Sequence, residues 1–381
     1  MRQGRRNQLV AVLALGAGLA GLAWWVLAGS TKTDQANRSV EPSTSTSSRT
    51  TTSRPVTSPT TEPGSGVSSP TRLVGDGGPV LGQPVGLSLL VGGQGSDSLE
   101  RFDLDTGVVT RYPGIGTPVA ASDRFLVLLA SASDGGFGQE GLLRAVPLDD
   151  LEAEGHDLGA AMGFYPWSTV APGPDPGQIW VLGAGDTPGW RLVGIDDGAV
   201  LETVPATAQA GQIPGAGPDI DSSASGGLFE RGPQGYRQVH PGRPLAVTED
   251  SVLTVTCTQP AVCELSWLSR ATWQPIDRAG PDDLILLVSF ISPDGRYLGY
   301  FGSDGGPLRR QHIFDAERRE TLNPAVTDSE VTSLAGSPDG RLLAVMSPSD
   351  LVLYNGDTGA TIAIGGGSEL GDAQMVFVSN G

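Results

Sequence analysis

The chain has only three histidines, His156, His240 and His312, as imidazoles that could serve as a general base or a metal ligand. They lie far apart and share no His-x-His or His-Glu-x-x-His spacing, which a metal or catalytic motif requires. No Gly-x-Ser-x-Gly nucleophile elbow stands between a strand and a helix. We therefore expect surface or strand histidines, and we do not expect a Ser-His-Asp hydrolase.

The two cysteines, Cys257 and Cys263, flank a short loop that contains a turn-forming proline between two strand-like runs. In an exported chain such a pair is expected to form a disulfide across a hairpin. Zinc binding would need further cysteines or histidines close by, and none is present. The spacing therefore predicts a disulfide rather than a metal or redox site.

Carboxylates are abundant, with 42 Asp and Glu against 24 Lys and Arg, for a net charge of -18. The basic patch that nucleic acid requires is missing, so no nucleic-acid partner is expected. Loop aspartates such as Asp304, which precedes two glycines, could bind calcium. Turn chemistry also explains them, so we expect no cofactor and keep calcium as an alternative.

Residues 1–8 form a basic tail with three arginines, and residues 9–28 carry no charge and are mostly Leu, Val, Ala and Gly. Twenty apolar residues are long enough to span a bilayer as a helix, which favours a retained signal-anchor. A cleavable signal peptide ending at Val26-Leu27-Ala28 stays an alternative. The arginines before the span place the N-terminus in the cytoplasm and the body outside, at the cell membrane.

Residues 29–70 are rich in Ser and Thr, with scattered prolines and almost no large apolar side chain. Such a segment cannot bury a core, so we expect a disordered stalk that lifts the body from the membrane. A plain spacer and an O-glycosylated stalk are both compatible with this composition. The body is then a single domain over residues 71–381.

The composition and the strand-like runs of the body, residues 71–381, predict an all-β fold. The 55 glycines and 29 prolines of the chain are more than a helical protein could carry, and short strand-like runs alternate with Asp-x-Gly turns. Trp167, Trp180, Trp190, Trp267 and Trp273 are expected mostly to pack between sheets.

One motif recurs. Ser292 to Arg296 and Ser337 to Arg341 both read Ser-Pro-Asp-Gly-Arg and are followed by alternating apolar residues. Asp294 and Asp339 can bond their own backbones, and Gly295 and Gly340 can take a positive φ, which makes tight turns feeding strands. A turn-and-strand unit that returns every forty-odd residues is typical of a β-propeller.

These turns resemble the WD40-like or PD40 repeats of TolB-type β-propellers. The resemblance implies a propeller that serves as an interaction platform, although the strong motif covers only two blades. At roughly 44 residues per blade the body has room for seven four-stranded blades. Six stay possible because Ala208 to Val247 is the weakest copy. We further expect Ala373 to Val378 to complete the first blade beside Gly86 to Val91 and so close the ring.

Two functions from different classes are compatible with these features. The first is a non-enzymatic, monomeric binding or scaffold module, tethered outside the membrane, for a protein or cell-envelope component. The second is a propeller-type enzyme, lactonase-like or acting on glycans, that uses acidic residues at the channel mouth, with or without calcium. The sequence offers no catalytic residues for the second, so the first is favoured.

Overall fold

The computed structural model describes residues 72–74, 77–93, 98–114, 116–130, 140–162, 170–183, 189–207, 213–223, 226–259, 262–281, 287–301, 311–322, 331–348, 350–365 and 373–380. The predicted tail, membrane span and stalk (1–8, 9–28 and 29–70) lie outside these residues. In the ranges just given, no helix is long and apolar enough to cross a bilayer.

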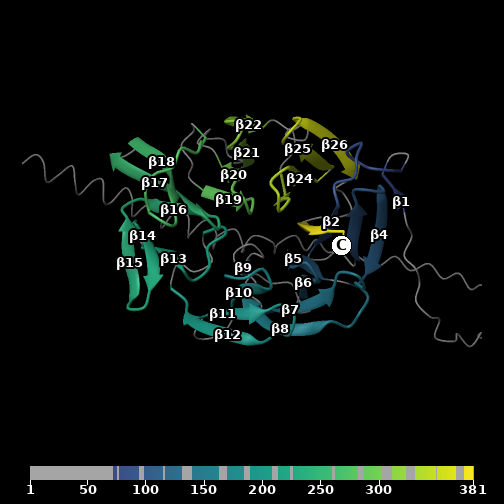
Figure 1. Cartoon of the computed structure of the whole chain (residues 1–381), viewed down its shortest axis with the longest axis horizontal. Coiled ribbons are helices and arrows are strands. Elements are labelled where there is room, and N and C mark those ends of the chain that lie inside the picture. The colour runs from purple at the N-terminus through teal and green to yellow at the C-terminus, as the bar shows by residue number, and fades with distance from the viewer. Residues whose placement is uncertain are drawn as a thin grey trace, which may run out of the picture. The chain divides into compact units, whose positions relative to one another are not determined.

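The described chain is all-β and forms seven sheets arranged as the blades of a propeller (Figure 1). The first blade holds β1 (Arg72–Leu73), β2 (Leu87–Gly93), β3 (Ser98–Asp103), β4 (Val108–Pro113) and β27 (Ala373–Ser379). The second holds β5 (Thr117–Ala121), β6 (Phe125–Ala130), β7 (Glu140–Pro147) and β8 (His156–Met162). The third holds β9 (Val170–Pro172), β10 (Gln178–Leu182), β11 (Gly189–Gly194) and β12 (Val200–Pro205).

The remaining blades follow in chain order. The fourth holds β13 (Ile220–Ser222), β14 (Leu228–Gly232) and β15 (Gly235–His240), and the fifth holds β16 (Arg243–Val247), β17 (Ser251–Gln259) and β18 (Val262–Ser269). The sixth holds β19 (Leu287–Ile291), β20 (Tyr297–Phe301), β21 (Gln311–Asp315) and β22 (Glu320–Leu322). The seventh holds β23 (Ser333–Gly336), β24 (Leu342–Met346), β25 (Leu351–Asn355) and β26 (Ala360–Gly365).

The apolar core lies between neighbouring blades. Strands near the middle of a blade are buried on both faces, as in β24, whose five residues are all buried. One cluster joins Leu89 and Phe102 of the first blade to Leu353 of the seventh, and another joins Val127 of the second to Val181 of the third. Each sheet therefore buries its two faces against the adjacent sheets, as a radial fold requires.

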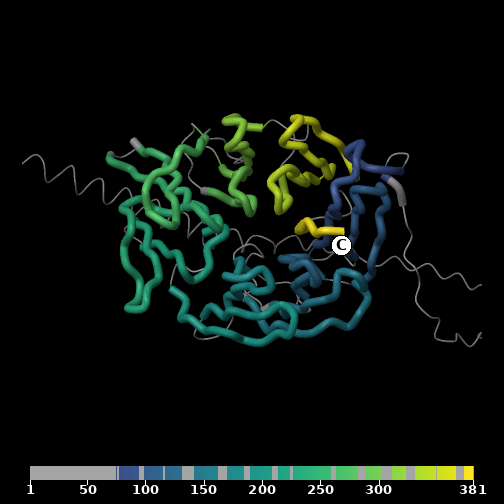
Figure 2. The backbone as a smooth tube through the Cα atoms, viewed as in Figure 1, coloured from purple at the N-terminus to yellow at the C-terminus, as the bar shows by residue number. Residues whose placement is uncertain are grey.

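The predicted ring closure is confirmed. β27 pairs antiparallel with β2 over seven residues, from Leu87↔Ser379 to Gly93↔Ala373. The C-terminal strand, yellow in the pictures, thus lies in the blade built by the N-terminal strands (Figures 1 and 2). β1 joins the outer side of the same sheet by pairing with β4, so this blade has five strands.

The blade count is seven, and two predicted details are corrected. Pro244 to Val247, assigned from the sequence to the weak fourth copy, belongs to β16 and pairs with β17 of the fifth blade. Trp273 to Ile276, which the sequence indicates as a further strand after Cys263 to Leu268, contributes only an isolated bridge between Leu268 and Pro275. The fourth and fifth blades accordingly have three strands each among the described residues.

The turn that follows the third strand of a blade, counted from the inner edge, has a common form. Its fifth residue takes a left-handed backbone in five blades, and it is glycine in three of them: Gly107, Gly198 and Gly359, with φ of 68°, 68° and 73°. In the fifth and sixth blades the same place holds Trp273 (φ 57°) and Arg319 (φ 56°). A bulky side chain with positive φ is costly, so these two turns are strained relative to the others.

Candidate functional site

The two Ser-Pro-Asp-Gly-Arg turns have the same hydrogen bonds. In the turn between β19 and β20, the Ser292 hydroxyl donates to Asp294 Oδ1 at 2.6 Å and accepts the Tyr297 N–H at 2.9 Å. The same carboxylate oxygen accepts the Arg296 N–H at 3.1 Å, and Gly295 has a φ of 72°. The motif thus satisfies its own polar groups and fixes the direction in which Arg296 leaves the turn.

The turn between β23 and β24 repeats this pattern. The Ser337 hydroxyl donates to Asp339 Oδ1 at 2.6 Å and accepts the Leu342 N–H at 2.9 Å. Gly340 has a φ of 69°, and a Cβ there would overlap the carboxylate of Asp294. The two predicted turns therefore lie against each other across the boundary between the sixth and seventh blades.

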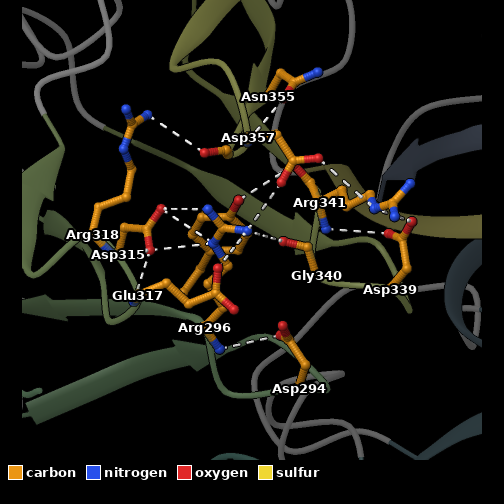
Figure 3. A network of polar contacts seen from close by, with 12 residues as sticks. Asp294, Arg296, Asp315, Glu317, Arg318, Asp339, Gly340, Arg341, Asn355 and Asp357 are labelled. Carbon is orange, nitrogen blue, oxygen red and sulfur yellow. Dashed lines mark hydrogen bonds and ion pairs between the residues drawn. The ribbon is translucent and has the colours of Figure 1, made fainter. Parts of the chain in front are cut away.

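Arg296 is the centre of a network at this boundary (Figure 3). Its side chain is 6% exposed and lies beside the fully buried Asp315, whose two oxygens accept from Arg296 Nε at 3.2 Å each. Arg296 Nη1 also donates to the Gly340 carbonyl at 3.4 Å. Burial alone would lower the pKa of Arg296, but the hydrogen bonds and charge of Asp315 outweigh burial and raise that pKa.

The network continues to the surface. Arg296 Nη1 lies 2.9 Å from the carboxylate of Glu317, which is 65% exposed, and 3.7 Å from that of Asp357, which is 57% exposed. Arg341, 68% exposed, lies 3.8 Å from both Asp339 and Asp357. We call the surface formed by residues 292–296, 315–319, 337–341 and 355–359 the turn face. The turn face presents charges of both signs, and its buried pair, Arg296 and Asp315, is held by hydrogen bonds on several sides.

A second network closes the ring. Asn380 follows β27, and its side-chain carbonyl accepts the Ser88 hydroxyl at 2.5 Å while its amide donates to Asp105 at 3.0 Å. Asp105 Oδ1 also accepts the N–H groups of Val85 and Gly86, at 2.5 and 3.0 Å. Partial burial would raise the pKa of Asp105, but these hydrogen bonds more than offset it and lower that pKa.

The cysteines lie opposite each other in the β17–β18 hairpin. Cys257 and Cys263 are direct cross-strand partners, and their sulfurs are bonded at 1.96 Å. The bond fixes the loop end of the hairpin in one register, since a slip by one residue would separate the two sulfurs.

The three histidines lie in separate blades. His156 shares a hydrogen bond with the Ile195 carbonyl at 2.7 Å, His240 accepts the Gly242 N–H at 3.0 Å, and His312 stacks on Tyr300. In the described parts of the chain no three His, Cys, Asp or Glu side chains are grouped as metal ligands. Asp304, the aspartate named as a calcium candidate, lies outside those parts.

Four tryptophans contribute to packing. Trp180 and Trp190 are each 3% exposed and share one cluster, Trp267 is 2% exposed, and Trp273 packs partly buried against another cluster. Trp167 lies outside the described residues. The clusters of Trp267 and Trp273 join residues of two blades, as predicted, whereas the cluster of Trp180 and Trp190 holds residues of the third blade and the segment after it.

Sequence reasoning missed the residues that link the turns. Arg296 was seen only as the last letter of a motif, and its partner Asp315 stands nineteen positions away. The sequence did offer one signal. The hydrogen bonds inside the turn use Ser292, Asp294 and the backbone, so the guanidinium of Arg296 must find its partner elsewhere in the chain. Asn380 and Asp105 are 275 positions apart, and only the predicted ring closure could have brought them together.

No family model matches the chain, and no curated protein matches it by sequence. Among solved structures it is similar to TolB from Acinetobacter baumannii, with 11% identity and a TM-score of 0.43 over 77% of this chain and 66% of that one. It is also similar to a putative 6-phosphogluconolactonase from Bacteroides fragilis, with 14% identity and a TM-score of 0.43 over 77% and 98%.

A third similar structure is the β-propeller domain of the Trilobed protease from Pyrococcus furiosus, with 8% identity and a TM-score of 0.49 over 74% and 95% of the two chains. The propeller fold itself rests on the seven sheets of the chain.

Proposed function

We propose that this seven-bladed propeller is a non-enzymatic binding module, tethered outside the cytoplasmic membrane, for a protein or a cell-envelope component. The observation that carries the proposal is the turn face. There the buried Arg296–Asp315 pair holds the exposed carboxylates of Glu317 and Asp357 in place. Charged groups that are already ordered lose little entropy when a partner binds, so such a surface suits recognition of a polar partner.

The N-terminal sequence supports the location. Arginines before residues 9–28 favour a cytoplasmic N-terminus, and residues 29–70 then act as a stalk. Protease added to intact cells should release the body by cutting within residues 29–70. Protection of the body, under conditions that digest a known surface protein, would rule out this topology.

Binding at the turn face can be tested by photo-crosslinking in cells. A photoreactive amino acid at Arg341 should give a discrete crosslinked product, and the double charge reversal Glu317→Lys and Asp357→Lys should abolish it. The matched control places the same photoreactive group at Val200, which is 53% exposed on an outer strand of another blade. Equal crosslinking from both positions, or none from Arg341, would contradict the proposal.

The enzyme alternative predicts a different result. Calcium that raises the melting temperature of the purified chain, with magnesium having no effect, would favour a propeller-type hydrolase with acidic residues at the channel mouth.

A further inference from the structure

The outermost strand of a blade exposes a row of backbone N–H and C=O groups, and proteins usually protect such an edge. Three outer strands of this propeller are paired through a β-bulge: β8, β12 and β26. β15 is also bulged against its neighbour, β22 has only three residues, and β1, outermost in the first blade, has only two. Short and bulged edges are poor templates for another strand.

β18 of the fifth blade is different. It is eight residues long, and its pairing with β17 runs without a shift from Ser251↔Ser269 to Cys257↔Cys263, with a shift only beyond the cysteines, next to the loop. The disulfide between these cysteines fixes that register at the far end. Of the outermost strands that the structure describes, β18 is therefore the one with a long and regular edge.

The chain begins to cover this edge and then leaves it. Ser269 N–H donates to the Gln274 carbonyl and the Ile276 N–H donates to the Trp267 carbonyl, both at 2.9 Å. The next bond is local, from Arg278 N–H to the Ile276 carbonyl, which turns the chain away. Only one short bridge remains where five of the other blades have a fourth strand.

Arg278 explains the departure. Its guanidinium lies 4.7 Å from the Trp267 ring, and it donates to the Ser251 hydroxyl at 3.1 Å and the Asp294 carbonyl at 2.5 Å. These contacts draw residues 277–280 over the face of the sheet towards the sixth blade. There the Ala279 carbonyl accepts the indole N–H of Trp267 at 3.0 Å.

The unpaired part of the edge follows from the alternation of inward-facing and outward-facing backbone groups along an antiparallel strand. Because Trp267 and Ser269 direct their backbone groups outward, Leu265 and Cys263 do so as well. No backbone hydrogen bond from another described residue reaches Leu265 or Cys263 on that side. Two consecutive outward-facing residues offer four backbone groups to an added strand.

The side chains along the edge define what such a strand would carry. Leu265 is partly buried and apolar, so an apolar residue beside it would bury further surface. Glu264 is exposed on the opposite face, so a basic residue beside it would form a cross-strand ion pair. Ile276, 38% exposed, and Asp277, which is 94% exposed and paired with Arg319, flank the place where the chain departs.

We propose that the β18 edge, from Cys263 to Trp267, is a docking site where an extended segment of a partner polypeptide, with alternating apolar and basic residues, completes the fifth blade as its fourth strand. The inference rests on the proposed binding function but concerns a different surface from the turn face. The regular edge from Cys263 to Ser269, the missing fourth strand and the strained Trp273 turn all occur in this blade.

The test uses the full chain in mild detergent at physiological salt. The probe is a fluorescein-labelled peptide, Thr-Val-Thr-Val-Lys-Val-Thr-Val-Thr, and the control peptide has proline in place of the two valines beside the lysine. Fluorescence anisotropy should show binding of the first peptide and not of the second, because proline cannot form the ladder. No binding of either peptide to the wild-type chain would overturn the proposal.

The decisive variant is Leu265→Pro, which removes an outward N–H that β17 does not use and is a change that edge strands tolerate. It should weaken binding about tenfold, whereas Leu265→Ala, which keeps the N–H, should weaken it by no more than about fivefold. Equal binding by Leu265→Pro and the wild type would overturn the proposal.

Glu264→Lys provides the second arm in case Leu265→Pro does not fold. It changes only an exposed side chain, so it should weaken binding of the lysine peptide about threefold and favour a peptide with glutamate in its place. If Glu264→Lys still preferred the lysine peptide over the glutamate peptide as the wild type does, the proposal would be overturned.

Two further outcomes would show that the β18 edge binds something other than a partner polypeptide. A dimer that Leu265→Pro converts to monomer would assign the edge to a second copy of the chain. Peptide binding only after deletion of residues 29–70 would assign the edge to the chain's own stalk. Since the Arg341 crosslink does not depend on β18, failure of this inference can be distinguished from failure of the binding function.

Discussion

At the scale of single residues, the structure depends on a few polar side chains that each serve two purposes. Asp315 accepts the Glu317 and Arg318 N–H groups of its turn, at 3.0 and 3.1 Å, and also neutralises the buried Arg296. Asn355 accepts the two corresponding N–H groups in the next blade with a neutral side chain. The charge at Asp315 is therefore needed for Arg296 and not for the turn.

This comparison predicts the effect of Asp315→Asn. The amide can keep the turn but leaves a guanidinium buried without its counter-charge, so stability should fall by about 3 kcal/mol. Asp103→Asn is the matched control, because Asp103 makes the same turn bonds without a buried arginine, and it should cost under about 1 kcal/mol. Urea unfolding measures both, and equal losses would show that Arg296 is not held by charge.

Asp105 makes ring closure depend on pH. Hydrogen bonds lower its pKa in the folded chain below the ordinary value of 3.8. The stabilisation is thus fully present above that value and is lost as the pH falls through the lower folded pKa. Urea midpoints are compared at neutral and at strongly acidic pH. The drop in midpoint on acidification should be smaller for Asp105→Asn than for the wild type. Parallel losses would contradict this role.

At the scale of elements, the turns and strands with local signals were predictable. Ser-Pro-Asp-Gly-Arg encodes its own hydrogen bonds, so its position and form follow from five adjacent residues. Trp273 and Arg319 show where local rules stop. Glycine occupies the equivalent place in three other blades. The two larger residues make contacts with the preceding blade: Trp273 packs against a cluster that includes Leu228, and Arg319 pairs with Asp277.

The same limit explains why the fifth blade lacks a fourth strand among the described residues. Trp273 to Ile276 has strand-like residues, yet Arg278 directs the chain towards the sixth blade through its bond to the Asp294 carbonyl. Such competition between a local preference and a distant partner cannot be read from a single stretch of sequence.

The packing of the two motif turns gives a prediction at this scale. Gly340→Ala combines a positive φ with overlap at Asp294, whose carboxylate is already engaged by Ser292 and Arg296. Gly114→Ala is the control, because Gly114 has a similar φ of 73° and open space at its Cβ. Gly340→Ala should be the more destabilising in thermal melting, by about 1–2 kcal/mol beyond the cost of about 1 kcal/mol expected for both. Equal losses would show that the turns do not pack closely.

At the scale of the whole molecule, the described part of the chain is a ring whose ends share one blade. The repeat period predicted the seven sheets, and the leftover strand at the C-terminus predicted closure, because both follow from counting strands. The Asn380 contacts with Ser88 and Asp105 were not predictable, since they depend on side chains brought together only after the ring has closed.

Deletion of Ala373–Asn380 from the full chain tests the central claim, ring closure by the last strand, most directly. The deletion removes seven ladder pairs and the buried Met375, Phe377 and Val378. The melting temperature should therefore drop by on the order of 10 °C or more, and a synthetic peptide of these eight residues should restore part of the loss. A chain lacking only Gly381 is the control and should melt like the wild type. An unchanged melt after the full deletion, with no effect of the added peptide, would contradict closure of the ring by β27.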